Sequence, residues 1–251
     1  MIASERMMYI LQQLNKKGII NLKDVAKELS ISEATVRRDF ETLEKQGKLK
    51  RVLGGAASSD NIDDLMNHAE LSMCEKTAIN TAEKQKVATF AAKQVMEEDC
   101  IFLDGGTSIA PMMEILASKK IKIVTYSNLV LKRIRNPVAD IFIIGGQFIP
   151  QYDMFFGAVA QDVLRRFHFE HAFIGCAGVN LVDGAVYTTE VESMKLKLIA
   201  IERSAKKHLL LDDSKLEKRG FFEFANLQIF DTIFCNQNGK IHPDSEKFVF
   251  I

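Results

Sequence analysis

The sequence predicts an α/β protein with a small N-terminal winged helix-turn-helix unit and a larger Rossmann-like domain built on a parallel sheet. Three observations predict this fold class. The chain has 251 residues, more than one average domain. In its first 57 residues, apolar residues recur at helical spacing in three segments, and a short further segment alternates apolar with basic residues. From residue 75 onward, short apolar runs alternate with segments of helical character, which is typical of a parallel sheet covered on both faces.

The domain boundaries follow from the same pattern. We expect a winged helix-turn-helix over residues 1–57, a linker over residues 58–74 and an α/β domain over residues 75–251. The segment after residue 56 shows no sustained periodicity and contains SSDNIDD, as expected of a connection.

The composition favours a protein of the cytoplasm. No run of about 18 apolar residues occurs, so we expect no membrane span, and the N-terminal stretch lacks the features of a signal peptide. The four cysteines, Cys74, Cys100, Cys176 and Cys235, lie far apart and form no CxxC pair. This spacing favours reduced thiols and argues against a zinc site. We therefore expect neither a metal nor a cofactor.

The net charge is zero, but the charges are unevenly distributed. Residues 1–55 carry eleven Lys and Arg against seven Asp and Glu, a net charge of +4, and the remaining 196 residues carry −4. A basic N-terminal module on a mildly acidic body is typical of a nucleic-acid footprint confined to one module.

Three short helices are expected in the N-terminal module. Gly18 ends the first, Asn21 caps the second and Ser32 caps the third, because these residue types favour helix ends. The three-residue turn SIS joins the last two, which is the helix-turn-helix arrangement whose second helix enters a major groove. The apolar stripes of the three helices are Met7, Ile10, Leu11 and Leu14, then Leu22, Val25, Ala26 and Leu29, then Val36, Phe40 and Leu43.

The third helix and the segment after it present basic side chains. Arg37 and Arg38 lie opposite the apolar stripe and can reach guanine edges or phosphates, and Ser32 and Thr35 start the helix, where short hydroxyls reach backbone oxygens. In the following KLKRVLGGA, apolar residues alternate with basic residues before a pair of glycines, as in a two-stranded wing. A solvated amphipathic helix without a partner is the alternative interpretation. The wing residues expected to contact phosphates are Lys48, Lys50 and Arg51.

A family resemblance supports the DNA-binding interpretation. The stretch NLKDVAKELSISEATVRRDFETLEKQGKLKRVLGGA resembles the N-terminal winged helix of the DeoR-type bacterial repressors of sugar metabolism, with the core S-x-x-T-[VI]-R-R-D-[LF]-x-x-L followed by a basic wing and Gly-Gly. The resemblance implies a transcriptional repressor of a carbohydrate-metabolism operon. It also implies double-stranded operator DNA as a partner and a homo-oligomer, dimer or tetramer.

Six short apolar runs predict the strands of the larger domain: CIFLDGG, IKIVTYS, DIFIIGG, HAFIGCAG, HLLLDD and TIFCN. Alternate positions within each run differ little in hydropathy, which indicates strands buried on both sides. Five runs end in small or polar residues, at 104–108, 125–128, 145–146, 175–178 and 212–215. The carboxyl ends of parallel strands share one edge of the sheet, here named the rim, and ligands of open α/β sheets bind there.

The chemistry of the rim favours a phosphorylated ligand. In the GGTS turn, glycines allow close approach of the backbone, Thr107 and Ser108 donate hydrogen bonds, and the helix that follows favours an anion at its N-terminus. Lys215 supplies a countercharge, and Asp104 can accept a hydrogen bond from a sugar hydroxyl. A plain β–α turn is the alternative. The rim residues expected to bind the effector are Asp104, Gly106, Thr107, Ser108, Thr125, Ser127, Gly145, Gly146, Asp212 and Lys215.

The family resemblance extends over residues 75–236. The family motif D-x-G-[ST]-T matches Asp104, Gly106, Thr107 and Ser108, and D-x-S-K matches Asp212, Ser214 and Lys215. The resemblance adds Lys197, at the spacing of a lysine typical of the family, to the effector site. It implies release from the operator by a phosphorylated sugar or a related intermediate. The sequence departs from the pattern at Ser193, where an acidic residue is usual, and at Tyr126, where asparagine is common.

Two other functions remain open at this stage. The larger domain is also similar to ribose-5-phosphate isomerase and glucosamine-6-phosphate deaminase, which move protons with carboxylates. Gly175 and Gly178 stand where the isomerase carries its acids, which argues against an active enzyme of this class. A DNA-binding regulator without a small-molecule effector is the other alternative.

Overall fold

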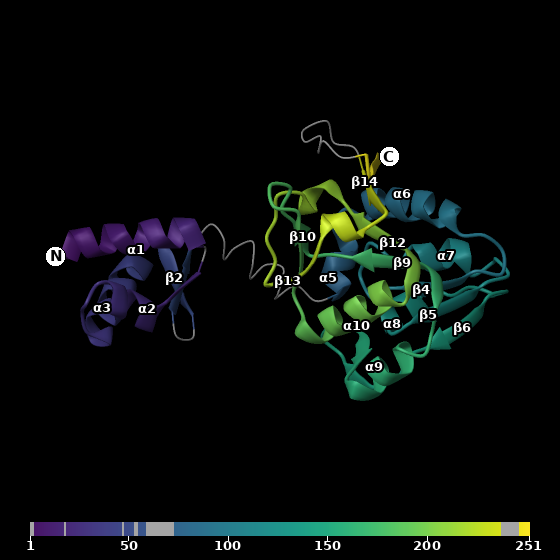
Figure 1. The fold of residues 1–251 in the computed structure, drawn as a ribbon, viewed down its shortest axis with the longest axis horizontal. Coiled ribbons are helices and arrows are strands. Elements are labelled where there is room, and N and C mark those ends of the chain that lie inside the picture. The colour runs from purple at the N-terminus through teal and green to yellow at the C-terminus, as the bar shows by residue number, and fades with distance from the viewer. Residues whose placement is uncertain (1–2, 18, 47, 53–54, 59–72, 237–245) are drawn as a thin grey trace. The chain divides into compact units, whose positions relative to one another are not determined.

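The computed structural model describes residues 3–17, 19–46, 48–52, 55–58, 73–236 and 246–251. The chain divides into two compact units, Met1–Glu70 and Leu71–Ile251, here named the N-terminal and C-terminal units (Figure 1). The predicted linker, residues 58–74, falls almost wholly outside the described residues, so its boundaries stay a prediction. Gly18, the expected end of the first helix, also lies outside them.

The described residues of the N-terminal unit form three helices and a three-stranded antiparallel sheet. Its elements are α1 (Ala3–Lys17), β1 (Ile19–Asn21), α2 (Leu22–Glu28), α3 (Glu33–Lys45), β2 (Leu49–Val52) and β3 (Gly55–Ser58), and the strand order is β1-β3-β2. The expected two-stranded wing is confirmed as the antiparallel pair β2 and β3, whereas the third strand, β1, was not predicted. Ile19 and Ile20 are β-branched residues, which favour strands, and they pair with Ala57 and Ala56 of β3, which buries the Ile20 side chain.

The two predicted N-caps, Asn21 and Ser32, and the predicted core of α3 are confirmed. Asn21 accepts a hydrogen bond from the backbone N–H of Lys23 at 2.8 Å and starts α2, and Ser32 accepts one from Thr35 at 3.2 Å and starts α3. The apolar stripe of α3, Val36, Phe40 and Leu43, is fully buried. The local spacing of apolar and capping residues thus determines where both helices of the helix-turn-helix lie.

One buried charge in this unit has no counterpart in the sequence-based prediction. Asp39 of α3 is only 4% exposed, and its Oδ2 accepts a hydrogen bond from Arg6 Nε of α1 at 2.8 Å. A second bond joins Arg6 Nη2 to Oδ1 at 3.0 Å. This bidentate pair fixes α1 against α3, because both carboxylate oxygens are satisfied by one planar guanidinium.

The C-terminal unit is built on a fully parallel seven-stranded sheet with the order β15-β14-β12-β9-β4-β5-β6. All six predicted apolar runs lie in this sheet, which confirms the fold class. The seventh strand, at the C-terminus, was not predicted. The strands are β4 (Cys100–Leu103), β5 (Lys122–Thr125), β6 (Asp140–Ile143), β9 (Phe169–Gly175), β12 (Ser204–Leu211), β14 (Thr232–Cys235) and β15 (Phe248–Phe250).

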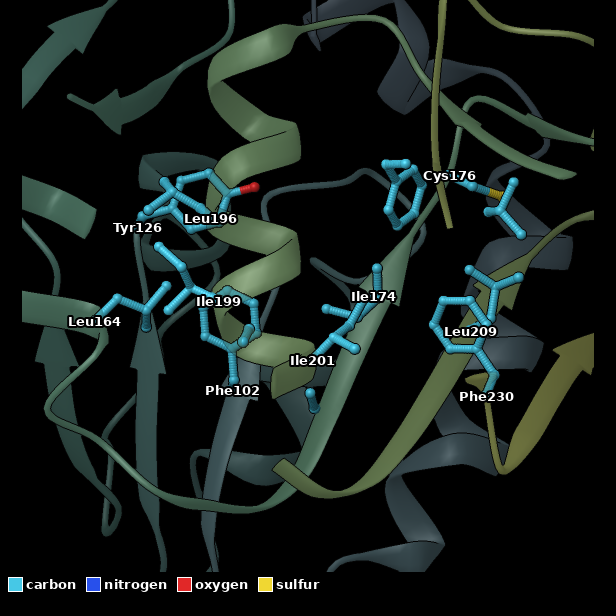
Figure 2. Packing of buried hydrophobic residues seen from close by; sticks show 14 of the residues in the cluster. Phe102, Tyr126, Leu164, Ile174, Cys176, Leu196, Ile199, Ile201, Leu209 and Phe230 are labelled. Carbon is cyan, nitrogen blue, oxygen red and sulfur yellow. The ribbon is translucent and has the colours of Figure 1, made fainter. Parts of the chain in front are cut away.

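Helices cover both faces of this sheet, and successive residues of a strand point to opposite faces. Phe102 of β4 packs in the cluster that includes α9 and α10, whereas its neighbours Ile101 and Leu103 pack in the cluster that includes α6 and α7. Figure 2 shows the first cluster around α10. The helices are α5 (Met73–Ala78), α6 (Thr81–Ala91), α7 (Met112–Leu116), α8 (Asn128–Leu131), α9 (Ala158–Leu164) and α10 (Val191–Glu202), with 3₁₀ turns η1 (Ala92–Gln94), η2 (Asp213–Lys215) and η3 (Leu227–Ile229).

Two smaller antiparallel sheets complete the unit. They are β7-β8, made of Gln147–Ile149 and Met154–Phe156, and β10-β11-β13, made of Gly178–Val179, Ala185–Thr188 and Phe222–Asn226. No helix in the described ranges is long and apolar enough to cross a membrane.

Two local expectations are wrong. The run DIFIIGG forms β6, but it is not buried on both sides: Phe142 is 42% and Ile143 is 53% exposed, because β6 is the edge strand of the sheet. The helix expected directly after the GGTS turn begins only at Met112, and Pro111 occupies its N-cap position. Residues 107–111 form turns instead.

A buried histidine pair joins the two central strands β9 and β12. His171 Nδ1 lies 2.8 Å from His208 Nε2, and the His208 ring stacks on Phe173 at a centroid distance of 4.9 Å. His208 Nδ1 has no hydrogen-bond partner among the described residues. Burial, together with the neighbouring His171 and Lys206, lowers the pKa of His208 to about 4, although Asp231 acts in the opposite direction.

This pair predicts an acid-sensitive fold. Unfolded His208 takes up a proton below pH 6.5, whereas the folded protein does so only near pH 4, so the folded state loses stability as pH falls between these values. The loss attributable to His208 is about 3 kcal/mol over this range. Urea unfolding of the wild type and of His208→Phe between pH 4 and pH 7.5 measures it. We expect a flatter pH dependence in the variant, and parallel curves would contradict the assignment.

Candidate DNA-binding face and effector site

The exposed face of α3 carries the two predicted arginines. Arg37 and Arg38 are both exposed, and neither guanidinium forms a hydrogen bond or ion pair with another described residue. Ser32 and Thr35 lie at the N-terminus of the same helix, with their hydroxyl oxygens 2.9 Å apart. Because the opposite face of α3 is buried in the core of the unit, this face presents guanidinium donors directly to solvent.

The wing residues differ in their surroundings. Lys48 is exposed, and the side chain of Lys50 lies outside the described residues. Arg51 is engaged within the unit: its Nε lies 2.7 Å from Glu44 Oε2 and its Nη1 lies 3.0 Å from Glu41 Oε1. A phosphate contact by Arg51 would have to compete with these two carboxylates.

The rim of the C-terminal unit contains the point at which the strand order reverses. From β4 the chain proceeds through β5 to β6 on one side, and then returns to β9, which pairs with the other side of β4. Ligands of open α/β sheets bind where such a reversal opens a crevice. The turn from Asp104 to Ser108 follows β4, and Gly175 ends β9, so both lie at this point.

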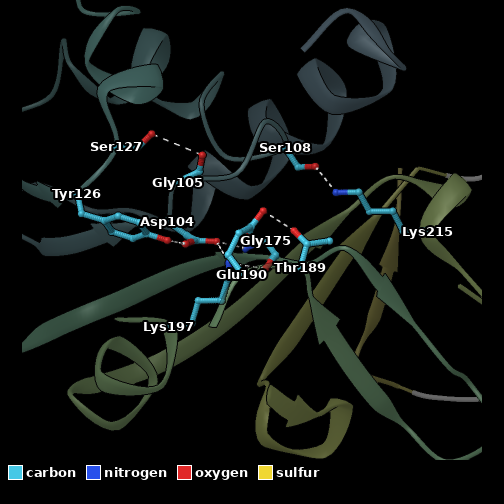
Figure 3. A network of polar contacts seen from close by, with 10 residues as sticks. All are labelled: Asp104, Gly105, Ser108, Tyr126, Ser127, Gly175, Thr189, Glu190, Lys197 and Lys215. Atoms are coloured by element: carbon cyan, nitrogen blue, oxygen red, sulfur yellow. Dashed lines mark hydrogen bonds and ion pairs between the residues drawn. The ribbon is translucent and has the colours of Figure 1, made fainter. Parts of the chain in front are cut away.

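A buried ion pair fixes the two strand ends (Figure 3). Asp104 is completely buried and accepts hydrogen bonds from the Tyr126 hydroxyl, from the Gly175 N–H at 2.8 Å and from Lys197 Nζ. Lys197 Nζ also donates to the Gly175 carbonyl at 2.9 Å. Both oxygens of Asp104 therefore accept hydrogen bonds within the chain, and its bond to a sugar hydroxyl stays a prediction.

The two departures from the family pattern lie at the same place. The hydroxyl of Tyr126 bonds to Asp104, and Ser193 is a polar neighbour that opposes the rise in the pKa of Tyr126. Burial and the charge of Asp104 raise the pKa of Tyr126 well above its usual value, so this phenol stays protonated. Tyr126 thus belongs to the hydrogen bonds around Asp104, and Ser193 is its neighbour there.

A second group of contacts joins the end of β12 to the turn after β4. Lys215 Nζ lies 3.1 Å from Ser108 Oγ, as Figure 3 shows. Asp212 is buried and accepts hydrogen bonds from Asn80 Nδ2 at 2.8 Å and from Ser214. Burial raises the pKa of Asp212, but the charge of Lys215 and the bonds from Ser214 and Asn80 outweigh it, so the pKa lies below its usual value.

The other predicted rim residues are less closely connected to this group. Gly106 and Thr107 lie in the turn between Asp104 and Ser108, and Thr107 is 8% exposed. Thr125 Oγ1 accepts a bond from the N–H of Ser127. Ser127 Oγ caps α8 and also donates to the Gly105 carbonyl oxygen at 3.5 Å, in the turn after β4 (Figure 3). Among the described residues, no hydrogen bond links Gly145 or Gly146 to the Asp104–Lys197 and Ser108–Lys215 contacts.

Three side chains near the rim escaped the sequence-based prediction: Asn80, Lys84 and Glu190. Lys84 of α6 is 5% exposed, and its Nζ donates to the carbonyl oxygen of Lys76 at 2.5 Å. Its signal is visible in retrospect. Lys84 lies three, four and seven residues before Val87, Ala88 and Ala91, which form the buried stripe of α6, and a lysine in an apolar stripe must bury its stem.

Comparisons with known proteins cover both units of the chain. Residues 6–62 match the DeoR-like helix-turn-helix domain, and residues 79–237 match the DeoR C terminal sensor domain. The chain belongs to the DeoR family of transcription regulators. The DeoR-type lactose phosphotransferase system repressor of Streptococcus mutans is 30% identical over 247 residues, which covers 96% of each chain. The regulator FruR of Bacillus subtilis is 30% identical over 228 residues, 90% of this chain and 88% of its own.

Solved structures are more distant from this DeoR-family chain. Ribose 5-phosphate isomerase A of Neisseria gonorrhoeae is 20% identical, with a TM-score of 0.36 over 54% of this chain and 53% of the isomerase. The translation-factor subunit eIF2B delta of Chaetomium thermophilum is 12% identical, with a TM-score of 0.46 over 62% of this chain and 56% of its own. These values are too low to transfer an activity to the present chain.

Proposed function

We propose that this DeoR-family regulator represses a carbohydrate-metabolism operon. It binds double-stranded operator DNA as an oligomer through α3 and the wing, and a phosphorylated sugar bound at the rim releases it. The observation that carries the effector assignment is the contact of Lys215 with Ser108, which brings an ammonium group to a hydroxyl-bearing turn at the reversal of strand order.

The N-terminal unit supports the DNA-binding part of the proposal. Arg37 and Arg38 are exposed on the second helix of a helix-turn-helix, the element that enters the major groove in this class of domain. The relative from Streptococcus mutans is named as a repressor of a lactose phosphotransferase system. This name supports a sugar and a phosphoryl group as the chemistry of the effector.

Release requires that the effector bind more tightly to one conformation than to another, because a ligand with equal affinity for both shifts nothing. The effector must favour a conformation in which the N-terminal units do not have the spacing that the operator requires. Operator affinity then falls by the ratio of the effector's affinities for the two conformations. We place the sugar phosphate between the turn after β4 and the end of β12, where the two strand ends bring Ser108 and Lys215 together.

Thermal-shift screening of the full chain tests the proposal. Each sugar phosphate is paired with its dephosphorylated sugar, because a ligand that binds the folded state raises the melting temperature. We expect one phosphorylated compound to stabilise the protein and its unphosphorylated partner to have little effect. A regulator that needs no effector would show no stabilisation across the panel while it still binds operator DNA.

The alternative of a sugar-phosphate isomerase or deaminase lacks a suitable pair of acids. A Cβ at Gly175 would lie 3.4 Å from Asp104 Oδ2, and a Cβ at Gly178 would lie 2.4 Å from the carbonyl oxygen of Lys218. The backbone at Gly178 therefore has no room for an acidic side chain, and a carboxylate at Gly175 would face the charge of Asp104.

We expect no turnover of sugar phosphates. Glycines at these two positions carry no proton-transferring group, so incubation with ribose 5-phosphate and with glucosamine 6-phosphate should show only background conversion. Product formation is followed by chromatography, with heat-inactivated protein as the control. Turnover of about 1 s⁻¹, an ordinary value for an enzyme, would favour the enzymatic alternative.

A further inference from the structure

Arg51 of β2 is bonded to α3 at three points. Its backbone N–H donates to Glu44 Oε1 at 2.9 Å, and its Nε donates to Glu44 Oε2 at 2.7 Å. Its Nη1 donates to Glu41 Oε1 at 3.0 Å. Both oxygens of Glu44 are thus bound by one residue, because a planar guanidinium presents its donors in fixed directions. Arg51 therefore ties β2, the first strand of the wing, to the C-terminal half of α3.

The pleat of β2 gives the Arg51 side chain this direction. Alternate residues of a strand point to the same face. Leu49, two residues before Arg51, is only 3% exposed and packs in the core that the buried stripe of α3 shares. Arg51 leaves the same face of the strand, and the register that buries Leu49 also pairs Arg51 with Ala56 of β3. The strand therefore directs this guanidinium to the helix.

The two carboxylates lie where they would oppose DNA binding. Glu41 follows Arg37 by four residues and Arg38 by three, so it is their neighbour on the surface of α3. Glu44 lies in the last turn of α3, where the helix macrodipole disfavours an anion. Without a cation beside them, both carboxylates would repel the phosphates of a duplex that α3 approaches. Arg51 supplies that cation to both.

We propose that Arg51 is a positioning residue of the DNA-binding face, which holds the wing against α3 and neutralises Glu41 and Glu44 but binds no DNA phosphate itself. This inference rests on the proposed function, and it gives Arg51 a different role from the phosphate contact expected from the sequence. A phosphate contact would take its donors from two carboxylates and leave these uncompensated beside the DNA. Lys48, which is exposed, stays available for a phosphate.

Arg51→Lys tests this role, because it keeps the charge and removes the planar guanidinium. Fluorescence anisotropy measures binding to a duplex selected by the wild type and to an unrelated duplex of equal length. We expect affinity for the selected duplex to fall about 3- to 10-fold, the effect of one lost hydrogen bond. Affinity for the unrelated duplex should stay within about 2-fold, because non-specific binding depends on charge. A phosphate-binding Arg51 would leave both affinities near the wild type, since lysine also binds phosphate.

Glu44→Gln changes the same contact from the side of α3. The specificity ratio, the affinity for the selected duplex divided by that for the unrelated one, should fall as in Arg51→Lys. The double variant should lose no more than Arg51→Lys alone, because both substitutions break one contact. If Arg51 bound a phosphate, Glu44 would be its competitor. Glu44→Gln would then raise both affinities and leave the specificity ratio unchanged.

Two control variants separate positioning from charge. Lys48→Ala is the reference for a phosphate contact: it should lower both affinities equally and reduce the salt slope by about one, whereas Arg51→Lys should leave that slope unchanged. Asp24→Asn removes one exposed carboxylate of the same unit, from α2, and should leave the specificity ratio at the wild-type value.

The outcomes distinguish this inference from the proposed function. A wild-type specificity ratio in Arg51→Lys, together with weaker operator binding by Arg38→Ala, overturns the role of Arg51 and leaves α3 as the DNA-reading helix. A wild type that does not distinguish the two duplexes overturns both proposals. Melting curves identify a variant whose N-terminal unit unfolds. If Arg51→Lys does so, Glu44→Gln carries the test, and higher affinity for both duplexes at an unchanged ratio contradicts the proposal.

Discussion

Replacing Arg38 by alanine is expected to weaken specific operator binding by about 1–3 kcal/mol if its guanidinium contacts a base. Arg38 is exposed on α3, and no other described residue engages its guanidinium, so the donors are available for a guanine edge or a phosphate. The measurement is fluorescence anisotropy with a duplex selected by the wild-type protein, at fixed salt, because phosphate contacts make affinity strongly salt-dependent.

Arg37→Ala and Lys45→Ala complete this experiment. Arg37 belongs to the same exposed face, whereas Lys45 is an exposed lysine at the C-terminal end of α3 and serves as the control for general loss of charge. We expect Arg37→Ala or Arg38→Ala to weaken operator binding more than Lys45→Ala does. Wild-type affinity in both arginine variants at matched salt would refute the assignment of α3 as the DNA-reading helix.

The sequence predicts most of the N-terminal unit because its determinants are local. Asn21 and Ser32 start helices through bonds to residues two or three positions away, and the stripe of α3 repeats within two turns. The third strand and the pairing of Arg6 with Asp39 were missed because they join residues more than 30 positions apart. No local spacing encodes such partners.

The same distinction applies to the C-terminal unit. Buried parallel strands are recognisable as apolar runs, and their carboxyl ends necessarily share an edge, so the turn after β4 and the segment of Lys215 were placed at the rim correctly. The exposure of β6 was not predictable, because the order of strands decides which one lies at the edge. The bond between Asp104 and Lys197 was not predicted, because the two residues lie 93 positions apart in the sequence.

The lysines show what sequence reasoning can still recover. Lys197 entered the site only through the family resemblance, and the structure gives it a physical reason in its pairing with Asp104. Lys84 was overlooked, although its place in the apolar stripe of α6 is a local signal. A charged residue at a position that periodicity assigns to the core needs a partner, and that partner indicates where the site extends.

The response to the effector should depend on Lys215 more than on any other side chain of the rim. Lys215→Ala is expected to abolish release from the operator and to leave DNA binding intact, because the arginines expected to contact DNA belong to the other unit. Charge-assisted hydrogen bonds dominate the affinity for a phosphate, and Lys215 Nζ already lies 3.1 Å from Ser108 Oγ in the turn that would hold it. Thr107→Val should behave similarly but more mildly, since it loses one hydroxyl and no charge.

Operator binding titrated with the sugar phosphate that stabilises the wild type measures this effect. Lys195→Ala is the matched control, because Lys195 is exposed on α10 and pairs with Glu192 three residues away. The dephosphorylated sugar should release the wild type only at far higher concentration, because the donors of the phosphate site would be left unpaired. An effector midpoint in Lys215→Ala equal to that of the wild type and of Lys195→Ala would show that the phosphate binds elsewhere, and the rim would then lose its role as the sensor.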